Sequence, residues 1–102
     1  MPGFIEIKRQ PVAELCRRCH VRRLDVFGSA SRDDFDPESS DIDLLVEFES
    51  SAASSLFDDY FSLREGLELL FAKPVDLVMA SALRNPYVQN SIDSQRLPLY
   101  GA

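Results

Sequence analysis

The most regular pattern in the chain is an alternation of apolar and other side chains over residues 41–48. A period of two predicts a β-strand with one face in the core. The opposite face begins with Asp41 and Asp43, and a shift of the pairing by one residue would bury both carboxylates, so we expect a firm register. The apolar face consists of Ile42, Leu44, Val46 and Phe48.

Two more strands are predicted over residues 22–27 and 75–80. In the first of them, Leu24 and Val26 share a face and Asp25 lies on the other. A Gly-Ser pair follows the first strand as a turn, and a Lys-Pro pair precedes the second. The strands are therefore separated by segments that break regular structure.

Three segments have the apolar period of a helix: residues 11–20, 56–71 and 84–95. Pro11 suits the first turn of a helix, because proline lacks the N–H that would be unpaired there. A short apolar stretch covers residues 97–100.

The helix predicted over residues 56–71 carries more apolar side chains than one face usually needs. We expect residues 50–55, which are small, to form a linker before it. Either the extra side chains pack into a broad core, or they form an exposed face that binds another protein. The main stripe is Leu56, Tyr60, Leu63, Leu67 and Leu70, and the extra residues are Phe57, Phe61, Leu69 and Phe71.

Helices and strands alternate along the chain, which predicts an α+β fold with a small mixed β-sheet and helices packed on one face. The other face would carry the acidic residues. The length of 102 residues suits one compact core, so we assign residues 1–102 to a single domain.

The net charge of −6 argues against an extended nucleic-acid partner, because affinity for a phosphate backbone comes from basic surface. No apolar run approaches the roughly 20 residues that span a bilayer. The N-terminal stretch also lacks the apolar region of a secretory signal. We therefore expect a cytoplasmic protein with no membrane partner.

Cys16 and Cys19 precede His20, which matches the haem-attachment pattern C-x-x-C-H. Both cysteines also continue the apolar helical stripe of Val12 and Leu15, and a buried free cysteine behaves as a small hydrophobe. We favour core packing of two reduced thiols over a haem or half of a zinc site.

Asp41 and Asp43 share one strand face, so their α-carbons are about 6–7 Å apart. Two carboxylates at this spacing repel each other unless a cation lies between them. Magnesium is typically held by one or two carboxylates together with substrate phosphates. The alternative is a pair of solvated aspartates at a sheet edge, since an isolated Asp-x-Asp is a weak pattern.

Neighbouring residues strengthen the interpretation as a metal and nucleotide site. Gly28 leaves room for a phosphate, and the Ser29 hydroxyl with backbone N–H groups at a helix start would favour anionic oxygens. Asp76 lies on a different strand between apolar residues, where a charge needs a reason. Asp76 would complete the metal site and accept a proton from an attacking hydroxyl.

The chain resembles the minimal nucleotidyltransferase (MNT) family of the DNA polymerase β superfamily in three stretches, GSASRDDFDPESSDIDLLVEF, KPVDLV and LRNPYVQNSIDSQRLPLYGA. The resemblance spans essentially the whole chain and implies a polymerase β palm-like nucleotidyltransferase fold. It also implies that Gly28 and Ser29 hold the triphosphate and that Asp41 and Asp43 bind two magnesium ions. Asp76 would be the third carboxylate of this site and would activate the acceptor hydroxyl.

The resemblance implies transfer of AMP from ATP, with release of pyrophosphate. Members of the family are commonly antitoxins that bind and adenylylate a tyrosine of a HEPN-domain ribonuclease toxin. We therefore expect a magnesium-dependent protein adenylyltransferase, the antitoxin of a type VII-like pair, with a HEPN toxin as its partner. The alternative is a weak or inactive antitoxin of the same fold that neutralises its partner by binding alone.

One departure from the family lies after the Gly-Ser pair. Relatives often read Ala-Arg-Gly there, whereas this chain has Ser31, Arg32 and Asp33. The carboxylate of Asp33 would repel a phosphate. Because all three acids of the motif are present, we favour an active enzyme. Arg32 either contacts a phosphate or is a solvated loop arginine.

Overall fold

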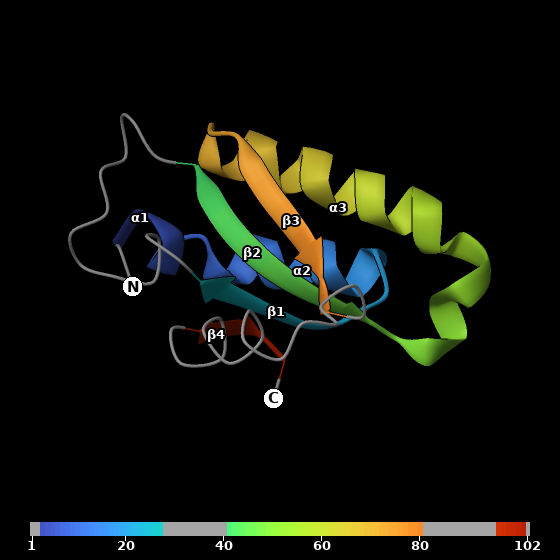
Figure 1. Cartoon of the computed structure of the whole chain (residues 1–102). Helices are drawn as coiled ribbons and strands as arrows, with labels where there is room; N and C mark the ends of the chain where they lie inside the picture. Colours follow the sequence, from blue (N-terminus) through green and yellow to red (C-terminus); the bar gives the residue numbers. More distant parts are fainter. Residues whose placement is uncertain (1–2, 28–40, 81–95, 102) are drawn as a thin grey trace.

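The computed structural model describes residues 3–27, 41–80 and 96–101 of the chain (Figure 1). The described elements are α1 (Gly3–Glu6), α2 (Arg9–Arg18), β1 (Val21–Phe27), β2 (Ile42–Phe48), the 3-10 helix η2 (Ser50–Ser55), α3 (Leu56–Phe71), β3 (Val75–Met79) and β4 (Leu97–Tyr100).

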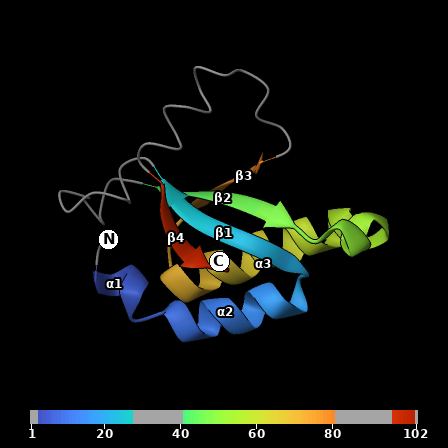
Figure 2. The same cartoon turned by 90° about the horizontal axis from the view of Figure 1, so that it is seen from below.

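The described strands form one mixed sheet in the order β3-β2-β1-β4. Strand β1 is antiparallel to both β2 and β4, whereas β2 and β3 are parallel and are connected through α3. Helices α1, α2 and α3 lie on the same side of this sheet (Figure 2). The predicted α+β fold, a mixed sheet with helices on one face, is therefore confirmed.

The core lies between these helices and the apolar face of the sheet. Helices α2 and α3 approach each other closely at Gly66, because a Cβ there would lie 2.7 Å from Cδ2 of Leu15. The core residues without exposed surface are Ile5, Val12, Cys16, Leu24, Val26, Ile42, Leu44, Leu63 and Leu67.

Most predicted elements are found near their predicted bounds. Helix α3 coincides with the prediction over residues 56–71. The first long helix is Arg9–Arg18 rather than 11–20, and it is preceded by the unpredicted short helix α1. Residues 50–55, which we expected to be a linker, form η2. The helix predicted over residues 84–95 lies outside the described residues.

The extra apolar residues of α3 divide between the core and the surface. Phe71 packs into the core at 6% exposure, whereas Phe57 and Leu69 are 78% and 80% exposed and Phe61 is 49% exposed. Broad core packing is therefore wrong for three of the four residues, because the sheet covers only one side of the helix.

No described helix is long and apolar enough to cross a membrane.

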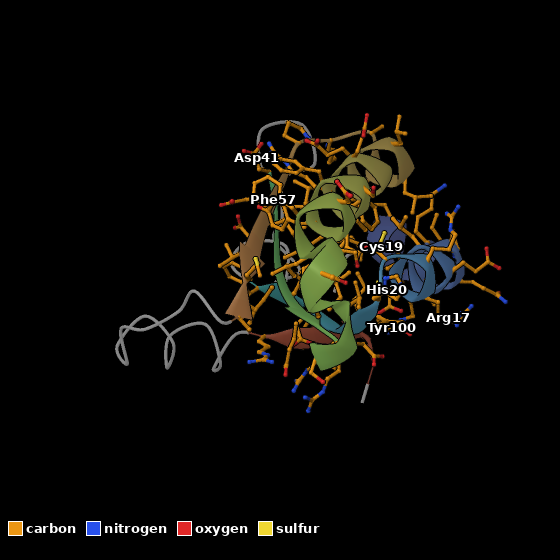
Figure 3. The ribbon with its side chains drawn as sticks, turned by 90° about the vertical axis from the view of Figure 1, so that its right-hand side faces the viewer. Arg17, Cys19, His20, Asp41, Phe57 and Tyr100 are labelled. Carbon is orange, nitrogen blue, oxygen red and sulfur yellow. The ribbon has the colours of Figure 1, made fainter. Side chains whose placement is uncertain are left out.

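The helical stripe at the end of α2 is buried as predicted. Cys16 and Cys19 are free and buried beside Val12 and Leu15. Burial raises the pKa of the Cys16 thiol to about 12 and also raises that of Cys19, so both thiols stay protonated and unreactive at neutral pH. Core packing is thus confirmed. His20 follows α2 (Figure 3) and places Nδ1 3.0 Å from Oδ2 of Asp59 on α3.

The sheet face away from the helices is less open than its sequence pattern indicates. Asp25 and Leu45, which occupy opposite positions of β1 and β2, are 0% and 2% exposed. The face therefore combines an exposed acidic end with a buried middle.

We expect Leu63→Ala to lower the free energy of unfolding by about 2–5 kcal/mol, because it leaves a cavity under α3. Leu69→Ala, the same substitution at an exposed position of that helix, should stay within about 0.5 kcal/mol of the wild type. Urea unfolding followed by circular dichroism measures both, and equal losses would contradict the assignment of the core.

Candidate active site

Two aspartates, Asp43 and Asp76, form an acidic row across β2 and β3 on the sheet face away from the helices. Asp43 of β2 lies opposite Asp76 of the parallel strand β3 and opposite Phe27 of the antiparallel strand β1. Residues paired in this way project their side chains to the same face. The carboxylates of Asp43 and Asp76 are therefore neighbours, although 33 positions separate them in the sequence.

Asp41 stands immediately before β2 and is exposed. Strands β2 and β3 begin at the same end of the sheet (Figure 1), so this residue precedes the start of the parallel pair. The N–H of Ile42, between the two aspartates, donates to the carbonyl oxygen of Pro74 at 3.2 Å. This bond starts the parallel pairing and sets Asp43 level with Asp76.

Asp76 and Asp41 act electrostatically on Asp43. The pKa of Asp43 is raised above its ordinary value, mainly by burial and then by the negative charges of Asp76 and Asp41. Like charges close together disfavour ionisation. A cation bound between them would relieve this repulsion, which is the property expected of a metal-binding cluster.

The described residues supply only part of a metal coordination sphere. In residues 3–27, 41–80 and 96–101, no group of three or more His, Cys, Asp or Glu side chains converges as metal ligands. Carboxylate oxygens from Asp43 and Asp76 on adjacent strands nevertheless suit a hard cation. Magnesium is usually held by one or two carboxylates plus substrate phosphates, so this donor set fits a metal that arrives with a nucleotide.

The structure places three of the six predicted site residues. It brings Asp41, Asp43 and Asp76 to one end of the sheet. The other three, Gly28, Ser29 and Arg32, lie outside the described residues, as does Asp33.

Sequence reasoning missed the role of Asp25. Its carboxylate has no exposed surface and accepts hydrogen bonds from the guanidinium groups of Arg23 and Arg96. A lone aspartate between the apolar residues of a short strand was the available signal, because a buried charge requires a partner. The sequence does not reveal that Arg96 is this partner.

Comparison with known proteins assigns a reaction class to this fold. The Nucleotidyltransferase domain model matches residues 9–98. A Methanocaldococcus jannaschii protein named "Putative protein adenylyltransferase MJ1379" is 38% identical over 88 residues, which cover 86% of each chain. Protein adenylyltransferase MntA of Thermococcus cleftensis is 43% identical over 72 residues, which cover 71% of this chain and 69% of MntA.

Solved structures agree with this assignment. One described as a "putative minimal nucleotidyltransferase" has a TM-score of 0.76 and 33% identity, and the match covers 91% of this chain and 90% of that one. A chain of the complex of tri-AMPylated Shewanella oneidensis HEPN toxin with MNT antitoxin has a TM-score of 0.63 and 18% identity, with coverage of 96% and 73%. The second likeness shows the fold alone.

A mixed sheet that presents paired aspartates opposite its helices is the architecture of a nucleotidyltransferase. The chain belongs to the nucleotidyltransferase domain family and, within it, to the minimal nucleotidyltransferases.

We expect Asp43→Asn to stabilise the fold at neutral pH. The folded state raises the pKa of Asp43 and so binds its proton more tightly than the unfolded chain does. The contribution of this group to stability is therefore fully present below the ordinary carboxyl pKa and falls as the pH rises through the raised value. The asparagine side chain of the variant does not ionise, so the variant avoids this loss of stability.

Urea unfolding at pH 7 and at pH 3 measures the effect. The stabilisation by Asp43→Asn should be present at pH 7 and shrink at pH 3, where the aspartate is neutral in both states. The control is Glu14→Gln on the exposed side of α2, which should show no such difference. A destabilised Asp43→Asn variant at pH 7 would contradict the electrostatic description of the site.

Proposed function

We propose that this protein is a magnesium-dependent adenylyltransferase that transfers AMP from ATP to a tyrosine hydroxyl of a partner protein. The observation that carries the proposal is the pairing of Asp43 with Asp76 beside Asp41, in a chain of the nucleotidyltransferase family. Curated relatives with at least 38% identity are named as protein adenylyltransferases, which supports a protein acceptor.

In the proposed reaction, the acceptor oxygen attacks the α-phosphorus of ATP. The bond from this phosphorus to the oxygen bridging to the β-phosphate breaks, and pyrophosphate leaves with that electron pair. Asp76 accepts the proton of the hydroxyl and passes it to solvent. Asp41 and Asp43, with Asp76, would hold the metal when it is bound with the nucleotide. Two magnesium ions would neutralise the charge on the attacking and leaving oxygens when bound.

The triphosphate end of the site is assigned to Gly28, Ser29 and Arg32. The small glycine and the hydroxyl suit close approach by phosphate oxygens, and an arginine is a strong partner for them. Asp33 would oppose this binding through charge repulsion. Full activity therefore requires that the bound cations outweigh the charge of Asp33.

The acceptor protein in this proposal is a HEPN-domain toxin, and the chain is its antitoxin. The Shewanella oneidensis complex contains an AMPylated HEPN toxin and an MNT antitoxin, which supports this choice of partner. The reaction draws on cytoplasmic ATP, and two free cysteines suit a reducing compartment. We propose residues 1–102 as one catalytic domain.

The second candidate function is neutralisation by binding alone. The observation that favours it is the exposed aromatic surface of α3, which includes Phe57 (labelled in Figure 3). The rings of Phe57 and Phe61 lie 5.3 Å apart between centroids. Exposed apolar side chains that lie together often mark protein interfaces.

The double variant Asp41→Asn/Asp43→Asn should lose AMP transfer by at least about a hundredfold, because metal stabilisation of the transition state contributes several kcal/mol. Transfer is measured with magnesium, labelled ATP and the HEPN partner. Glu14→Gln, a charge change on the exposed side of α2, is the matched control and should retain activity. Labelling of the partner that persists in the double variant would contradict the proposed mechanism.

The two candidate functions separate at Phe57. Under binding alone, Phe57→Glu should abolish neutralisation of the partner while the aspartate double variant retains it. Leu69→Glu is the matched control, since Leu69 has a similar exposure on the same helix. Catalytic neutralisation gives the opposite result for the aspartate variant, and circular dichroism verifies that each variant is folded.

A further inference from the structure

Asp25 is a fully buried carboxylate that the proposed reaction does not use. It lies in the middle of β1 with no exposed surface. Nε of Arg23, on the same strand, lies 2.9 Å from its Oδ2. Nε of Arg96, which immediately precedes β4, donates to the same oxygen. Asp25 therefore joins two strands through a buried, charge-assisted contact.

This contact is poorly explained as a device for stability. Removing two charges from water costs several kcal/mol per ion, and an apolar replacement of similar volume is often neutral or stabilising. Leu45, which pairs with Asp25 and shares its face, is 2% exposed, so an apolar side chain is buried beside this position. The charge of Asp25 therefore indicates a role in fixing one arrangement of the strands rather than in adding stability.

Asp25 lies next to the acidic row on the same face. It pairs with Leu45 of β2, and two residues further along these strands Phe27 pairs with Asp43. Residues two apart on a strand share a face, so Asp25 and Asp43 are diagonal neighbours across the sheet. A contact that fixes β1 at Asp25 therefore also fixes the end of β1 that flanks Asp43.

The backbone pairing of β1 with β4 is weak at this point. Strand β4 has four residues, and its register with β1 shifts between Leu24 and Asp25. Asp25 lies opposite Pro98, which has no N–H to donate. The side-chain contact from Arg96 to Asp25 supplies a link here that the backbone ladder lacks.

We propose that Asp25 and Arg96 are positioning residues of the nucleotidyl-transfer site, a role that rests on the proposed function. Their buried ion pair holds the last residues of β1 against the start of β4. Asp43, which lies opposite Phe27, thereby meets the nucleotide in the productive geometry.

The test compares the wild type with Asp25→Asn and with the apolar double variant Asp25→Leu/Arg96→Met. The double variant separates positioning from stability, because it removes Asp25 and Arg96 together and leaves only Arg23, whose side chain is 35% exposed and keeps contact with water. AMP transfer is measured at saturating ATP with the same acceptor protein. We expect kcat to fall about ten- to a hundredfold in both variants, because small displacements have such effects, while KM for the acceptor stays unchanged.

The matched control is Arg22→Gln. Arg22 forms an exposed ion pair with Glu47, 3.2 Å from Nη1 to Oε1, and joins β1 to β2 at the other end of β1. It should retain the wild-type kcat. A wild-type kcat in the folded apolar double variant would overturn the positioning role.

Amide hydrogen exchange tests the same role without activity. In the double variant, the amides of Val26 and Phe27 should exchange about tenfold faster than in the wild type, because the end of β1 opens more often. The Arg22→Gln control should not change them. If the wild type transfers no AMP, the proposed function fails, and exchange then decides the positioning role: unchanged rates at both amides overturn it.

Discussion

The parallel pairing of β2 with β3 is the constraint on which the rest of the site depends. The hydrogen bond from Ile42 N–H to the Pro74 carbonyl begins this pairing, and it sets Asp43 level with Asp76. The adjacent pair, Ile42 and Val75, points to the opposite face of the sheet. Both residues are buried under the helices, and this burial holds the register. A shift by one residue would move an aspartate into the core, so the packing that stabilises the fold also aligns the carboxylates.

The face opposite the helices carries two kinds of aspartate. Asp25 is neutralised by arginines and is closed to solvent, which makes it a structural charge. Burial, and then the neighbouring like charges, raise the pKa of Asp43, so its ionised form gains when a cation binds. The fold thus accepts an electrostatic cost at one end of the sheet, which is common where a site awaits a charged ligand.

Several elements could be predicted because their signals are local. The alternation around Asp43 predicted β2, and the helical period over residues 56–71 predicted α3 with its observed bounds. The width of the buried face could not be predicted in the same way. Phe57 and Leu69 are exposed because only one side of α3 meets the sheet, and a helical period does not state how much surface the sheet offers.

The sequence by itself determined the alternation of helices and strands and the apolar face of β2. These properties follow from the repeat of apolar and polar residues within one helix or strand. Only the tertiary structure decided that Asp76 stands beside Asp43 and that Arg96 reaches Asp25 over 71 positions of the chain. Such contacts depend on how strands from distant segments align. That alignment is set by packing of the whole core, which no local pattern contains.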